Sequence, residues 1–160
     1  MRIGRLLEGA RAYVAVRGGC ALSGPNEVVV GADPGTPATS QAASRAVAGD
    51  VVRVWPGPRL GWFEPGAWER LMVAPWDVVS TSRVGARLMG EPVRRAVHGE
   101  LPSEGLVEGA LQVPPDGQPI IMLADHPVTG GYPVVAVVDP RDLHVVAQAA
   151  AGTTLRLRPA

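Results

Sequence analysis

The chain has 160 residues, of which 46% are hydrophobic and 19% charged, and its formal net charge is zero. This length predicts one domain with a good core, or one domain plus part of another. The balanced charge argues against a nucleic acid or an anionic membrane as the main partner. We therefore expect no nucleic-acid partner and no membrane partner.

Residue usage limits the chemistry further. All 15 basic residues are arginine, so a catalytic lysine or a biotin-carrying lysine must belong to another chain. Cys20 is the single cysteine and is predicted to be a small buried residue, and the three histidines lack a ligand-pair spacing. We expect no metal ion on this chain. The sequence shows neither a membrane-spanning apolar stretch nor a signal-peptide pattern, which favours a cytoplasmic protein.

The first 49 residues show no complete domain pattern. Residues 11–17 predict a strand, and residues 22–49 are rich in glycine, proline, serine, threonine and alanine apart from the short apolar run of residues 28–30. Such a composition favours a linker or a mobile loop. We therefore interpret residues 1–49 as the remnant of a preceding domain plus a linker, and place the folded domain at residues 50–160.

Residues 50–160 predict mostly strands. A short helix is expected over residues 64–72, and a second begins with Asp139 as N-cap and Pro140 at its first position and ends at Gly152. The four tryptophans between Trp55 and Trp76 are interpreted as core residues. Strands are predicted at 51–55, 76–80, 86–89, 106–113, 119–124, 132–138 and 153–158. This pattern predicts a mainly β domain, a β-barrel with two short helices.

Two arginines are candidate ligand-binding residues. Arg83 and Arg87 are four residues apart, a spacing that places both guanidinium groups on one face of a strand. There they can hold a carboxylate or phosphate in bidentate fashion. The alternative is that each is a surface arginine paired with a nearby acid, and the sequence does not separate the two.

Residues 109–133 contain an apolar run between two turn-rich loops, one with Asp116 and Gly117 and the other with Gly130 and Gly131. Such loops are ordinary turn chemistry between strands, and they are also common places for binding residues. A Gly-Gly backbone can form a nest of N–H groups that binds an oxyanion. Both interpretations remain open from these residues alone.

Several ordered blocks of the sequence resemble the biotin-dependent carboxyltransferase family. This group includes the C subunit of bacterial 5-oxoprolinase, allophanate hydrolase subunit 2 and the carboxyltransferase part of urea carboxylase. The blocks are Arg11 to Gly19, Gly57-Pro58-Arg59, Arg83-Val84-Gly85-Ala86-Arg87-Leu88, Ser103-Glu104-Gly105, Gly109 to Pro114, Asp116 to Ile120, Leu123 to Pro133, and Asp142-Leu143 with Gln148.

The resemblance implies a cyclophilin-like β-barrel and identifies residues 50–160 as the C-terminal carboxyltransferase domain. It also implies a cyclophilin-like partner subunit, of the type of the 5-oxoprolinase B subunit, and a small-molecule amide substrate. ATP is implied at the level of the complex, and biotin only if another chain carries it. The family's chemistry is ATP-dependent opening of a cyclic amide or carboxyl transfer to a urea-like amide.

The site residues are inferred from local chemistry. Asp125 and Glu104 are the candidate catalytic residues, placed to orient an amide N–H. The candidate substrate-binding residues, which would hold a carbonyl or carboxylate, are Arg83, Arg87, Gln112, Thr129, Gly130, Gly131 and Tyr132. Two alternatives remain: a non-catalytic regulatory or scaffolding module that binds a cyclophilin-like partner, and a truncated, inactive relative.

Overall fold

The computed structural model describes residues 10–11, 19–24, 27–32, 35 and 49–160. The chain forms two compact units, one of Met1–Arg11 with Val47–Ala160 and the other of Ala12–Ala46. Except for Arg11, the strand predicted at residues 11–17 lies outside the described residues. Within the described residues no helix has the length and apolar character needed to cross a membrane.

The smaller unit contains a hairpin. Strands β1 (Cys20–Gly24) and β2 (Glu27–Val30) pair antiparallel, with Cys20 opposite Val30. Part of the stretch predicted as linker is therefore a paired strand, and its three valines are about half exposed. The prediction of a buried cysteine is wrong, because Cys20 is exposed on this hairpin.

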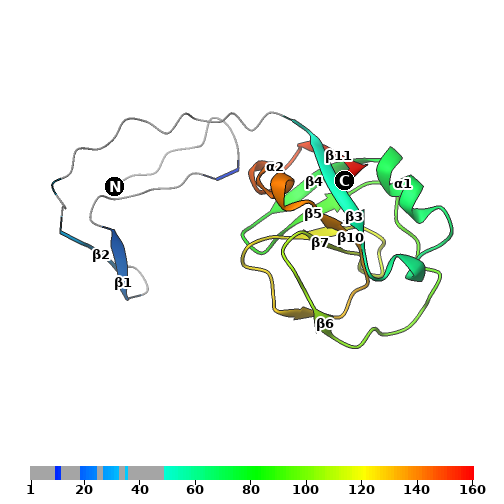
Figure 1. Ribbon diagram of the computed structural model, residues 1–160, viewed down its shortest axis with the longest axis horizontal. Helices are drawn as coiled ribbons and strands as arrows, with labels where there is room; N and C mark the ends of the chain where they lie inside the picture. The colour runs from blue at the N-terminus through cyan, green and yellow to red at the C-terminus, as the bar shows by residue number, and fades with distance from the viewer. Residues whose placement is uncertain (1–9, 12–18, 25–26, 33–34, 36–48) are drawn as a thin grey trace. The chain divides into compact units, whose positions relative to one another are not determined.

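The larger unit is built around a closed barrel (Figure 1). Its strand order is β10-β3-β11-β4-β5-β8-β7, and all neighbours are antiparallel except β3 and β11, which are parallel. The predicted mainly β, cyclophilin-like barrel with two short helices is confirmed in its strand content, its closure and its helices. The strands are β3 (Val51–Pro56), β4 (Pro75–Thr81), β5 (Gly85–Met89), β7 (Ala110–Gln112), β8 (Ile120–Met122), β10 (Val134–Val138) and β11 (Thr154–Pro159).

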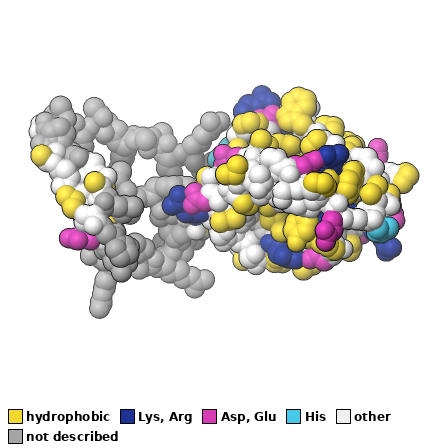
Figure 2. Space-filling model, turned by 90° about the horizontal axis from the view of Figure 1, so that it is seen from below, with side chains coloured by type: hydrophobic (Ala, Val, Ile, Leu, Met, Phe, Trp, Pro, Cys, Tyr) yellow, Lys and Arg dark blue, Asp and Glu magenta, His cyan; other side chains and the backbone are white. Residues whose placement is uncertain are grey.

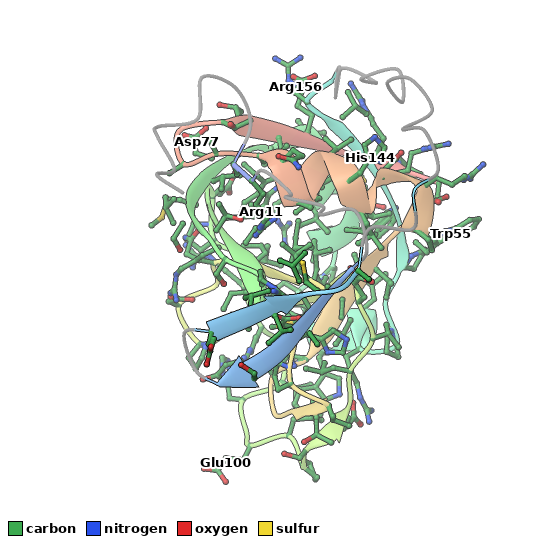
Figure 3. All side chains as sticks on the ribbon, turned by 90° about the vertical axis from the view of Figure 1, so that its left-hand side faces the viewer. Arg11, Trp55, Asp77, Glu100, His144 and Arg156 are labelled. Carbon is green, nitrogen blue, oxygen red and sulfur yellow. The ribbon has the colours of Figure 1, made fainter. Side chains whose placement is uncertain are left out.

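Alternate residues of each strand point into the barrel and fill its interior, because successive side chains point to opposite faces of a strand. In β3, Val52 and Val54 are fully buried, whereas Trp55 is 51% exposed and points away from the barrel (Figure 3). The tryptophan prediction is therefore wrong for Trp55. It is confirmed for Trp76, which is buried and donates its indole N–H to the carbonyl oxygen of Leu71 at 3.0 Å. Partly buried Trp62 and Trp68 pack against the core.

Two short helices flank the barrel. Helix α1 (Ala67–Val73) begins later than predicted, after Gly66, whose φ is 79°, and is preceded by the 3-10 turn η1 (Leu60–Trp62). The second begins as predicted at Asp139, whose carboxylate accepts a hydrogen bond from the backbone N–H of Arg141 at 2.9 Å. It runs through the 3-10 turn η2 (Pro140–Asp142) into α2 (Leu143–Gln148). It ends before Gly152, which lies in the following turn.

A two-stranded ribbon lies outside the barrel. Strand β6 (Glu104–Gly105) pairs with β9 (Thr129–Gly130). In Figure 1 β6 lies at the bottom of the barrel unit, below α1 and α2. A second buried apolar cluster joins the ribbon to the outer face of the barrel. It consists of Leu106, Ala110, Met122 and Val134. This outer layer covers part of the β7 and β8 surface and leaves a groove beside it.

Gly57 provides a test of the barrel's packing. It follows β3 at the point where the chain passes β10, and a Cβ there would lie 2.4 Å from the carbonyl oxygen of Val134. We predict that Gly57→Ala lowers the free energy of unfolding by about 2 kcal/mol or more, because backbone must move to relieve the overlap. Urea denaturation measures the change.

Gly61 is the matched control, because a Cβ there has no atom within 4 Å. Gly61→Ala should leave stability within about 0.5 kcal/mol of wild type or raise it slightly. Equal effects at the two glycines would contradict the packing of Gly57 against β10.

Candidate functional site

A groove of about 460 Å³ lies on the outer face of β5, β8 and β7, beside the segment that leads out of β9. We call it the Gln112 groove. Strand register creates it: Ile120 of β8 pairs with both Arg87 of β5 and Gln112 of β7. These three side chains therefore lie on one face of the sheet, opposite the buried Leu111 and Ile121.

Gln112 is the most buried polar group of the groove, at 3% exposure. Its side-chain nitrogen donates to the carbonyl oxygen of Tyr132 at 2.9 Å. A Cβ on Gly130 would lie 2.6 Å from that nitrogen, so glycine allows β9 to approach this close. Among the described residues none donates a hydrogen bond to the amide oxygen of Gln112. That oxygen remains available to a ligand N–H.

Arg87 lines the groove and is paired with an acid outside it. Its Nη2 lies 2.5 Å from Oδ2 of Asp116, in the turn between β7 and β8. That turn is the loop predicted around Asp116 and Gly117, and it is closed by a 3.0 Å hydrogen bond from the backbone N–H of Gly117 to the carbonyl oxygen of Pro114. This ion pair fixes the orientation of the Arg87 guanidinium, and therefore also the direction of its remaining N–H donors.

Arg83 and Asp125 lie at the edge of the site and do not line the groove. Nε of Arg83 lies 2.7 Å from Oδ2 of Asp125, and the backbone N–H of Asp125 donates to the carbonyl oxygen of Arg83 at 2.9 Å. Arg83 lies in the turn before β5, so the prediction that it shares a strand face with Arg87 is wrong. Each arginine is paired with a different acid.

Glu104 is held by Arg59. Nε of Arg59 donates to one carboxylate oxygen at 3.1 Å, and Nη2 pairs with the other. This hydrogen-bonded pair lowers the pKa of Glu104 below its ordinary value. The carboxylate therefore stays ionised at neutral pH, and it does not line the groove.

The segment from Thr129 to Tyr132 forms one wall of the groove through its last three residues. Thr129 pairs with Gly105 in the outer ribbon and is not part of the wall. Neither Gly130 nor Gly131 has a positive φ, so the predicted nest is absent here. Within the described chain the backbone N–H groups of Gly131 and Tyr132 make no hydrogen bond, so both remain as single donors.

Arg11 fixes the opposite rim. Its guanidinium donates to Oγ1 of Thr81 at 3.2 Å and to the backbone carbonyl oxygens of Ser82 and Ala147, and its backbone N–H donates to the side chain of Gln148 at 3.2 Å. Ser82 in turn accepts N–H groups of the turn before β5. The turn beside the groove is thus tied to the end of α2.

The structure therefore brings together five of the predicted substrate-binding residues, which are Arg87, Gln112, Gly130, Gly131 and Tyr132. It leaves Asp125, Glu104, Arg83 and Thr129 outside the groove. The sequence interpretation missed the other lining side chains, of which Ser80, Ser82, Val84, Ile120 and Met122 are the main ones. Alternation from the buried positions of β5 and β8 is the signal that identifies Ile120 and Met122 as outward residues.

The acids near α2 have a structural role. Asp142 accepts hydrogen bonds from the backbone N–H of Arg53 at 2.9 Å and from its guanidinium at 2.8 and 2.7 Å, which lowers the pKa of Asp142. Arg141 likewise holds the pKa of Asp139 well below its usual range. Acidic and basic side chains also lie next to one another at several places on the face shown in Figure 2. The pair of Asp142 with Arg53 fastens the start of α2 to β3, whereas the pair of Asp139 with Arg141 is local.

Residues 24–159 match the family described as carboxyltransferase domain, subdomain A and B, and the chain belongs to this family. It is 36% identical over 110 residues to the 5-oxoprolinase C subunit of Escherichia coli (strain K12), covering 68% of this chain and 36% of that protein. It is also 36% identical over 108 residues to the 5-oxoprolinase C subunit of Haemophilus influenzae, covering 67% and 35%. The chain thus spans about a third of the length of these relatives.

Solved structures give the same relationship. The crystal structure of TTHA0988 aligns with a TM-score of 0.69 and 34% identity over 82% of this chain and 26% of that one. The Kluyveromyces lactis urea carboxylase aligns with a TM-score of 0.61 and 25% identity over 68% of this chain and 10% of that one. The barrel is therefore shared with both.

The Arg59 pair generates a prediction about protonation. We expect Arg59→Gln to raise the pKa of Glu104 toward its ordinary value, because the largest cause of its lowering is removed. Since the folded-state pKa of Glu104 lies below its unfolded value, the pair stabilises the fold above the unfolded pKa. That stability is lost as pH falls through the folded pKa.

Carboxyl carbon signals followed by NMR during an acid titration measure this pKa directly. Arg158→Gln is the control, because Arg158 is exposed on β11 and forms no ion pair among the described residues. An unchanged Glu104 titration in Arg59→Gln would show that the pair does not form in solution.

Proposed function

We propose that the chain acts as a subunit or domain of an ATP-dependent amide-processing complex of the 5-oxoprolinase or urea carboxylase type. In this proposal the Gln112 groove binds the amide substrate. The observation that carries it is the buried Gln112 amide, whose oxygen has no donor among the described residues and which shares the groove with Arg87. Membership of the carboxyltransferase family supports the reaction class.

The groove offers complementary groups to an amide. The oxygen of Gln112 accepts the substrate N–H, and the N–H groups of Gly131 and Tyr132 donate to a substrate carbonyl or carboxylate oxygen. Arg87, paired with Asp116, supplies further N–H donors beside them. Apolar contact comes from Ile120 and Met122 at the strand surface. A small, planar, partly apolar amide is matched by this combination.

Asp125 and Glu104 act differently in this proposal. Each is a partner in a two-point pair with an arginine and stands outside the groove. We propose that they fix the loops on which the groove depends: Asp125 through the turn at Arg83, and Glu104 through the ribbon at β6. Direct participation of either carboxylate in the reaction stays a prediction.

In this proposal the cofactors of the complex do not bind in the Gln112 groove. The one guanidinium that lines the Gln112 groove is already paired with Asp116, so the groove does not fit a triphosphate. ATP, used at the level of the complex, is therefore not the ligand of this groove. The chain has no lysine, so biotin, where the reaction uses it, is carried by another subunit. ATP and carboxybiotin supply chemical activation, and this chain binds and orients the amide.

The partner in this proposal is a cyclophilin-like subunit of the type of the 5-oxoprolinase B subunit. Its support is the apolar wall of the groove, where Val84 is 49% and Tyr132 43% exposed, together with Val128, which is 81% exposed in the segment before β9. Such a rim is typical of a surface that another protein covers. The same rim is the observation that favours the second candidate function, a non-catalytic module that binds such a partner.

We predict that the chain, co-expressed with its partner subunits, supports ATP hydrolysis stimulated by 5-oxoproline, urea or allophanate. Gln112→Leu should lower that stimulated rate about tenfold or more, because the variant removes the groove's buried hydrogen-bonding group. The measurement is phosphate release with each substrate in turn, together with size-exclusion analysis of the complex.

Arg158→Gln, in the exposed part of β11, should leave the rate unchanged. Full assembly with no stimulation by any of the three amides would contradict the catalytic proposal and favour the binding module. Equal rates for Gln112→Leu and wild type would show that the amide does not bind in this groove.

A further inference from the structure

A second groove, of about 540 Å³, lies on another part of the barrel unit. It runs between the 92–99 loop and the turn between β7 and β8, and we call it the Arg94 groove. Its ionisable lining side chains are Glu64, Arg94, Arg95, His98 and Asp116. It shares no lining residue with the Gln112 groove.

Hydrogen bonds fix the walls of the Arg94 groove. The backbone N–H of Glu64 donates to the carbonyl oxygen of Arg94 at 3.1 Å, and that of Val93 donates to Gly117 at 2.9 Å. Ala96 and Val97 both donate to the carbonyl oxygen of Trp62. The 92–99 loop is therefore attached to two separate segments of the barrel unit, which gives the groove a defined shape.

The two acids that line this groove are each ion-paired with an arginine outside it. Asp116 is neutralised by Arg87 at 2.5 Å, and Glu64 lies 3.8 Å from Arg70. Neither of these arginines lines the groove. Both lining acids thus have partners outside it.

The basic side chains of the groove have no such partners. Arg94, Arg95 and His98 form no ion pair with any residue that the structure describes. Two guanidinium groups and an imidazole therefore line one concave surface without an ion-pair partner among the described residues. Bidentate guanidinium groups are the usual protein ligands for phosphate and carboxylate.

Arg95 is also incompletely satisfied. Its Nη2 donates to the backbone carbonyl oxygen of Val113, and its guanidinium lies 5.9 Å from the ring centre of Tyr132. Its Nε is buried and has no hydrogen-bond partner. A buried N–H donor without an acceptor is costly, and a nearby anion lowers the cost of burying that charged group.

We propose that the Arg94 groove binds a small-molecule oxyanion, a phosphate or a carboxylate, through Arg94, Arg95 and His98. Two contacts connect this site to the Gln112 groove. Asp116 of the Arg94 groove pairs with Arg87, and Arg95 contacts Tyr132. A bound anion near Asp116 and Arg95 therefore changes the electrostatic surroundings of two residues that line the Gln112 groove.

The test titrates the full chain with inorganic pyrophosphate and, in a separate arm, with succinate at low ionic strength. Isothermal calorimetry measures affinity, and the NMR signals of arginine Nε–H groups report the location. We expect saturable binding of at least one probe, with shifts at Arg94 and Arg95. Preference for pyrophosphate identifies a phosphate ligand, and preference for succinate identifies a carboxylate ligand.

Arg94→Gln should weaken the binding about tenfold, since one charge-assisted contact is lost. The Arg94 side chain is exposed and makes no hydrogen bond within the described residues, so the variant should fold normally. Arg158→Gln is the matched control and should bind as wild type. Binding of neither probe, or equal affinities for Arg94→Gln and Arg158→Gln, would overturn the proposal.

Discussion

The pairing of β11 with β3 and β4 is the constraint on which the rest of the structure depends. It joins residues 77 to 105 positions apart in the sequence and closes the barrel. Closure fixes which side chains fill the interior, because alternate positions along each strand must then point outward. Leu111 and Ile121 enter the core for this reason. Gln112 and Ile120 are consequently presented on the outer face, where the groove forms.

Ion pairs between arginines and acids hold the loops on the outer surface of the barrel in position. The chain uses arginine alone as its cation, and planar guanidinium groups can hold a carboxylate at two points. Arg59 with Glu104 and Arg83 with Asp125 are such pairs, and each attaches a loop to another element. Exposed pairs contribute little stability individually. Here the two pairs fix the positions of loops near the Gln112 groove, and neither acid lines the groove.

Local patterns predicted most of the fold. The alternating strands and the Asp139-Pro140 helix start are short-range signals, and the structure has them close to the expected residues. The sequence could not show that Arg83 lies in a turn, because strand ends depend on register with neighbours. Nor could it show that Gly130 is needed for contact with Gln112, since that contact joins separate strands. Both points concern tertiary placement rather than residue type.

The most direct test of the account is an NMR titration of the full chain with 5-oxoproline, urea and allophanate. The side-chain amide of Gln112 and the backbone amides of Gly131 and Tyr132 are the signals to follow. We expect at least one of these compounds to shift all three signals saturably, while signals from the barrel interior stay fixed. Saturable shifts confined to other surfaces, or no shift with any of the three compounds, would contradict the assignment of the groove as the amide site.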